Sequence, residues 1–91
     1  MHDVSEVPAQ SGIIPFRSRN GEVEVLLVTS STRRRWIIPK GHIEPHMTSR
    51  DSAAKEAYEE AGVRGRVRHV PLGSYLHDSP QEGAVVEVFL M

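Results

Sequence analysis

The chain contains no cysteine, so a disulfide framework and thiol catalysis are both excluded. Aromatic residues make up only 5% of the sequence, and no apolar run is long enough to cross a bilayer. Charges nearly balance at a formal net charge of -1, which leaves no overall basic excess for nucleic-acid binding. Residues 1–10 lack the basic and apolar regions of a secretory signal peptide. We therefore expect a cytoplasmic protein that binds neither nucleic acid nor a membrane.

What the sequence does contain indicates one modest α+β domain over residues 1–91. Of these residues 38% are hydrophobic and 25% charged, as in ordinary globular proteins. Residues 11–16 and 23–29 are β-prone and flank Asn20-Gly21, which is a strong signal for a β-hairpin. A further strand is expected to begin at Trp36, and a loop containing proline and glycine follows it.

The second half of the chain predicts one helix and then more strands. Thr48 or Ser49 can cap a helix over residues 50–61. Residues 63–77 alternate imperfectly, which favours one or two twisted strands, and residues 78–83 favour a turn. Residues 84–91 then form an almost wholly apolar strand. A strand of this kind needs cover on both faces, so we expect the domain to be incomplete at its C-terminus by about a third, with the remainder absent or supplied by a partner.

Three carboxylates cluster on the predicted helix, at Glu56, Glu59 and Glu60. The i, i+3, i+4 spacing places them on one face, whereas Ala53 and Ala57 fall on another face that can pack closely on a sheet. Like charges at this spacing repel one another, and a divalent cation would offset the repulsion. Mg²⁺, or Mn²⁺ in its place, prefers such oxygen ligands. A solvated acidic helix face is the alternative.

The segment before the helix, residues 36–45, reinforces the metal interpretation. Gly41 allows a sharp turn or a close approach of the backbone, and a backbone carbonyl at Lys40 or Gly41 could complete a coordination shell. Taken alone, a proline and glycine cluster is equally typical of an ordinary turn.

Together the loop and helix resemble the signature of the Nudix hydrolase family, whose spacing residues 41–63 follow throughout. The positions that match the signature are Gly41, Glu56, Ala57, Glu59, Glu60, Gly62 and Val63. Two positions depart, because Met47 stands where the family has its first glutamate and Lys55 stands where it has arginine. In the family those two residues form an ion pair that braces the loop, so we expect Met47 to brace it by apolar packing instead.

The resemblance implies a Nudix fold, in which a mixed β-sheet is packed between helices (an α/β/α sandwich), here lacking its C-terminal part. It also implies Mg²⁺-dependent hydrolysis of a phosphoanhydride in a small phosphorylated molecule. The implied metal ligands are Glu56, Glu59, Glu60 and a backbone carbonyl at Lys40 or Gly41. Glu56 is our candidate for the proton acceptor, although another glutamate, or a later one such as Glu82 or Glu87, stays open.

A wider resemblance is to diphosphoinositol polyphosphate and diadenosine polyphosphate phosphohydrolases. It is carried by the runs at residues 16–18, 26–28, 30–31, 35–37 and 43–45. Within it, we expect Arg17, Arg33, Arg35 and Lys40 to bind substrate phosphates, since guanidinium groups pair bidentately with phosphate. Two further alternatives stay open. The protein could form a homodimer, and it could be a non-catalytic Nudix-like module with a ligand-binding or regulatory role.

Overall fold

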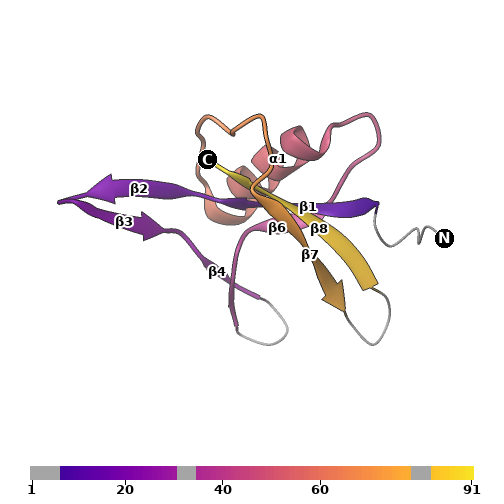
Figure 1. Cartoon of the computed structure of the whole chain (residues 1–91), viewed down its shortest axis with the longest axis horizontal. Helices are drawn as coiled ribbons and strands as arrows, with labels where there is room; N and C mark the ends of the chain where they lie inside the picture. Colours follow the sequence, from indigo (N-terminus) through magenta and orange to yellow (C-terminus); the bar gives the residue numbers. More distant parts are fainter. Residues whose placement is uncertain (1–6, 31–34, 79–82) are drawn as a thin grey trace.

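The computed structural model describes residues 7–30, 35–78 and 83–91, and a four-stranded mixed sheet forms its centre (Figure 1). The strand order is β6-β1-β8-β7, in which β1 runs parallel to β8 while β6 and β7 are antiparallel to their neighbours. Two small two-stranded sheets, β2–β3 and β4–β5, accompany it. The elements are β1 (Pro8–Ile14), β2 (Phe16–Arg19), β3 (Glu22–Val25), β4 (Val28–Thr29), β5 (Trp36–Ile37), β6 (Lys40–His42), α1 (Ser49–Ala61), β7 (Gly73–Asp78) and β8 (Gly83–Leu90).

The predicted turn at Asn20-Gly21 is confirmed, and it joins β2 and β3. The predicted strands are shifted, because residues 11–14 belong to β1 of the central sheet and residues 23–29 are divided between β3 and β4. The φ angles of Asn20 and Gly21 are 53° and 79°. Positive φ at both central residues is the geometry that a two-residue hairpin turn of the primed type requires, and Asn-Gly is its preferred sequence. In Figure 1 this hairpin projects away from the central sheet.

Helix α1 lies against one face of the central sheet, and its small residues make that contact. Ala53 and Ala57 have no exposed surface, and they pack in the core with Ile13 of β1 and Phe89 of β8. The predicted alanine face is therefore confirmed. Because alanine side chains are short, the helix axis can approach the sheet closely, and the glutamates on the neighbouring face are brought near β6.

The start of α1 is fixed by Thr48, as expected from the sequence. The Thr48 side chain accepts a hydrogen bond from the backbone N–H of Asp51 at 3.0 Å, and Thr48 itself has an extended conformation with φ -74° and ψ 161°. This is the arrangement of an N-cap residue, whose oxygen satisfies one of the free N–H groups of the first helical turn.

Replacing Thr48 by alanine should therefore destabilise the protein. We expect Thr48→Ala to lower the free energy of unfolding by about 0.5–2 kcal/mol, the usual range for loss of an N-cap. Urea denaturation followed by circular dichroism measures the change. Thr48→Ser is the matched control because it keeps the capping oxygen, and equal losses in both variants would contradict the assignment of the cap.

Two expectations about strands need correction. Residues 40–42, expected in a loop, form the edge strand β6, because the backbone of Gly41 pairs antiparallel with Ser11 of β1. Residues 63–72, all within the described part, form no strand, and the ordered pairing begins at Gly73. Most of the expected turn at residues 78–83 lies outside the described residues. Within the described ranges, no helix is both long and apolar enough to cross a membrane.

Candidate active site

The carboxylate of Glu56 lies directly over the backbone of Gly41. A Cβ atom placed on Gly41 would overlap this carboxylate, coming within 2.7 Å of Oε1 and closer to the other two carboxylate atoms. Only glycine leaves this space, because every other residue carries a Cβ. The glycine of edge strand β6 thus forms a cradle for one glutamate of α1, whereas the approach of the Gly41 backbone to a ligand stays a prediction.

Glu60 is held by the same strand. Its Oε1 atom accepts a hydrogen bond from the backbone N–H of Lys40 at 3.1 Å. Its negative charge also contributes to the raised pKa of Glu56, four residues earlier on α1. The strand therefore fixes two of the three predicted acidic ligands next to each other.

The electrostatics of this pair follow from its geometry. The pKa of Glu56 is raised above its ordinary value of 4.5, first because partial burial disfavours the charged form, and then because Glu60 and Glu59 carry like charge. The Lys55 ammonium acts in the opposite direction and lowers it in part. A cation bound beside Glu56 would offset this repulsion.

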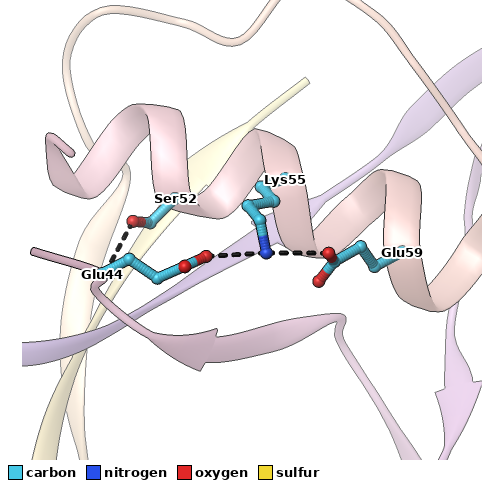
Figure 2. Close-up of polar contacts among 4 residues, drawn as sticks. All are labelled: Glu44, Ser52, Lys55 and Glu59. Carbon is cyan, nitrogen blue, oxygen red and sulfur yellow. Dashed lines mark hydrogen bonds and ion pairs between the residues drawn. The ribbon is translucent and has the colours of Figure 1, made fainter.

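Glu59 is turned toward a different partner. Its Oε2 atom lies 2.7 Å from the Nζ atom of Lys55, four residues earlier on α1. The same Nζ atom lies 2.7 Å from Oε2 of Glu44, in the segment between β6 and α1, so Lys55 bridges the two carboxylates (Figure 2). These contacts, with Glu44 first, raise the pKa of Lys55, so it is fully charged at neutral pH.

The binding of one cation by all three glutamates stays a prediction. In the described ranges, no group of three or more histidine or acidic side chains is arranged to hold a metal ion. The Glu59 carboxylate instead forms an ion pair with Lys55. Glu56 and Glu60 nevertheless supply adjacent carboxyl oxygens beside a backbone cradle without a Cβ. Their chemistry therefore fits a hard divalent cation, which prefers oxygen ligands.

The loop is braced by an ion pair, which corrects the expectation about Met47. Met47 is half-buried but lies outside the hydrophobic cluster of the core. Its backbone N–H donates to the carbonyl of Glu44 at 3.1 Å, closing a turn, and the charged contact with α1 is made by Glu44. The Glu44 backbone N–H also donates to Oγ of Ser52 at 3.1 Å.

Sequence reasoning missed both Glu44 and Ser52 as parts of this brace. The i, i+4 spacing of Lys55 and Glu59 is a signal for their pairing within one helix. The Glu44 contact spans eleven residues, and only the fold brings its two ends together.

One row of residues crosses the sheet beneath α1. Ser11 of β1 lies in register with Gly41 on one side and with Glu87 of β8 on the other. Residues in register share a face of a sheet, and so do residues two positions apart on one strand. Ser11 lies two positions before Ile13, and Glu87 two positions before Phe89, and both of these core residues pack with the alanines of α1. The row therefore faces α1. The Oγ atom of Ser11 is buried without a hydrogen-bond partner. Glu87 therefore lies on the same face as the Glu56 cradle, whereas Glu82 lies outside the described residues.

The predicted substrate-binding residues are not gathered at the carboxylates. Arg17 is on the projecting hairpin, where its Nε atom lies 2.6 Å from Oε1 of Glu24. It lines a cavity of about 600 Å³ whose lining includes none of the three glutamates of α1. The Nζ atom of Lys40 points toward Gln10 of β1, at 3.4 Å from Oε1. Arg35 is exposed, its backbone is bonded to that of Ser30, and Arg33 lies outside the described residues.

Comparisons with known proteins agree with the sequence motif. Nudix hydrolase 12, mitochondrial, from Arabidopsis thaliana is 38% identical over 76 residues, which cover 69% of this chain and 37% of that protein. Diphosphoinositol polyphosphate phosphohydrolase 3-alpha from Homo sapiens is 42% identical over 67 residues, covering 72% of this chain and 40% of that protein. The chain thus spans about two fifths of the length of these relatives.

Solved structures show the same fold. The crystal structure of the C. elegans Ap4A hydrolase superposes with a TM-score of 0.81 at 23% identity, covering 89% of this chain and 64% of that one. The NUDIX domain of Shewanella oneidensis NrtR, in a complex with ADP ribose, superposes with a TM-score of 0.74 at 16% identity, covering 90% of this chain and 57% of that one. The model of the NUDIX domain matches residues 8–90. The chain therefore belongs to the NUDIX domain family, and its mixed sheet with α1 has the fold of that family.

Proposed function

We propose that this chain carries the catalytic centre of a divalent-cation-dependent hydrolase that cleaves a phosphoanhydride in a small phosphorylated molecule. The observation that carries the proposal is the placement of the Glu56 carboxyl group over Gly41 and of the Glu60 carboxyl group on the backbone N–H of Lys40, both at the edge strand β6. Relatives named diphosphoinositol polyphosphate phosphohydrolase, and the structural likeness to an Ap4A hydrolase, support the substrate class. The domain boundaries 1–91, the C-terminal incompleteness and the cytoplasmic location remain predictions.

The residues of this chain have separate tasks in the proposed reaction. Glu56, Glu59 and Glu60, together with a backbone carbonyl at Lys40 or Gly41, would hold Mg²⁺ or Mn²⁺, and Glu59 would first have to leave its ion pair with Lys55. A bound cation would neutralise the charge on the bridging oxygens and lower the pKa of the attacking water. Glu56 accepts the proton of that water, because it is the most buried of the three carboxylates and its pKa is raised. Glu87 is the second candidate for this role, since it faces the same side of the sheet.

Four basic residues are proposed to bind the substrate. Arg17, Arg33, Arg35 and Lys40 remain our candidates for binding phosphates. Arg17 would have to leave Glu24, but this exposed pair costs little to break, since surface ion pairs contribute only about 0–1 kcal/mol.

A substrate panel tests the proposal. Diadenosine polyphosphates, diphosphoinositol polyphosphates and nucleoside diphosphate sugars are incubated with the protein and Mg²⁺ or Mn²⁺, and the products are identified by mass spectrometry. We expect cleavage of at least one class, with no cleavage after chelation. Glu60→Gln should weaken Mn²⁺ binding and turnover by at least about tenfold, the scale typical of residues around metal sites.

The same variant separates a functional role from a structural one. A glutamine carbonyl can still accept the hydrogen bond of the Lys40 N–H, so the melting temperature should stay unchanged. Glu22→Gln, on the projecting hairpin, is the control with the same change of charge. Unfolding of Glu60→Gln would show that the carboxylates are structural.

A non-catalytic module that binds a phosphorylated ligand is the second candidate function. Two observations favour it. Lys55 forms an ion pair with Glu59, and the fold resembles the NUDIX domain of NrtR, whose structure was solved in complex with ADP ribose. Binding of panel compounds without cleavage of any of them would favour this function over hydrolysis.

A further inference from the structure

The contact between Glu44 and Lys55 joins the loop after β6 to the middle of α1. Lys55 Nζ lies 2.7 Å from the carboxylates of both Glu44 and Glu59 (Figure 2). Glu44 is only three residues beyond Gly41, which cradles Glu56, and four beyond Lys40, whose N–H holds Glu60. A displacement of Glu44 would therefore be passed along a few residues of backbone to both sites.

Glu44 is attached to α1 at two points one helical turn apart. Its backbone N–H donates to the Oγ atom of Ser52, which is only 1% exposed, and its carboxylate pairs with Lys55. Ser52 and Lys55 are separated by three residues, so they lie on the same face of α1. A buried hydrogen bond together with a charged one fixes both the position and the rotation of this part of the loop, which neither contact does alone.

We infer that Glu44 is a positioning residue for the candidate active site, acting through Lys55. The Glu44–Lys55 pair holds the Lys40–Gly41 backbone at the distance from α1 at which Glu56 and Glu60 bind a divalent cation together. The same pair keeps the Lys55 ammonium between Glu44 and Glu59. This inference rests on the proposed function. It adds that Glu44 braces the loop in this chain, where Met47 and Lys55 replace the glutamate and arginine of the family signature.

The turn from Glu44 to Met47 suggests how the inference can be tested by rescue. The Met47 N–H bonds to the Glu44 carbonyl, so positions 44 and 47 lie at the two ends of one turn beside α1. A carboxylate introduced at position 47 therefore starts near Lys55 and can replace the one removed from position 44.

The experiment measures Mn²⁺ affinity by calorimetry on the whole chain without substrate, together with kcat, KM and the melting temperature. Glu44→Gln should weaken Mn²⁺ binding by about tenfold, the lower end of the range for residues that orient metal ligands, and it should lower kcat more than it raises KM. The melting temperature should change little, since this ion pair is partly exposed. Adding Met47→Glu to Glu44→Gln should restore affinity to within about twofold, whereas adding Met47→Gln should not.

The outcomes separate this inference from the proposed function. If the wild-type chain binds Mn²⁺ and Glu44→Gln binds it equally well, the positioning role is wrong and the proposed function stands. If Glu44→Gln only lowers the melting temperature, Glu44 is purely structural and the inference is likewise wrong. If the wild-type chain neither binds Mn²⁺ nor cleaves any compound of the panel, the proposed function fails together with this inference.

Discussion

Glu56→Gln is expected to lower kcat by about 10²–10⁴-fold, the range for removal of a positioned general base. Glutamine has nearly the same shape as glutamate, so the side chain still fits over Gly41, but it can neither accept a proton nor bind a cation with a full negative charge. Steady-state kinetics with the best substrate of the panel provide the measurement.

The stability of the same variant should depend on pH in a defined direction. Because the pKa of Glu56 is raised in the folded protein, the native state binds more protons than the unfolded state, and the contribution of this group to stability falls as the pH rises through the folded-state pKa. Glu56→Gln removes this loss. Its melting temperature should therefore equal or exceed that of the wild type at neutral pH, and the gain should vanish below the ordinary value of 4.5.

Glu22→Gln again serves as the control for Glu56→Gln. It removes one carboxylate from an exposed strand and should leave kcat unchanged. If Glu56→Gln retains more than about a tenth of the wild-type kcat, Glu56 is not the proton acceptor, and Glu87→Gln becomes the variant to measure.

Gly41→Ala is expected to lower kcat/KM by about 10²-fold or more while leaving the fold largely intact. The new Cβ would occupy the space of the Glu56 carboxylate, and a displacement of about 1 Å at a reacting group can cost this much. The overlap is with the end of a flexible side chain, which can swing aside, so the free energy of unfolding should change by less than the about 1–3 kcal/mol typical of overpacking in a rigid core.

Gly73→Ala is the matched control for Gly41→Ala. Gly73 also lies in a strand of the central sheet, and a Cβ there would meet no atom within 4 Å. Full activity of Gly41→Ala would show that the Glu56 carboxylate takes a different position during turnover.

Local signals in the sequence were sufficient for several elements. The Asn20-Gly21 pair favours a hairpin turn, Thr48 is a preferred N-cap residue for the helix that follows it, and the alanines of α1 recur with the helical period. Each of these depends on residues close together in the chain. The family resemblance then placed the loop and helix together, and the model of the NUDIX domain confirms it.

Features that depend on distant pairing were not predicted correctly. Strand β6 forms because β1, thirty residues earlier, offers an edge, and nothing within residues 40–42 indicates this. The partner of Lys55 was also missed, since the choice among Glu44, Glu59 and solvent is made by the path of the loop. The ion pair of Lys55 with Glu59 within the same helix was also not predicted, because only the repulsion among the glutamates was considered.

The position of β8 has a consequence for the order in which the protein assembles. This strand lies between β1 and β7, and its partner β1 begins about seventy-five residues earlier in the chain, so the pairing of β1 with β8 forms only after residues 83–90 have been synthesised. Ile13, which packs under α1, needs Phe89 beside it in the core. On the ribosome, β6 and α1 can therefore pack on β1 first, while the edge of β1 that pairs with β8 stays open until residues 83–90 emerge.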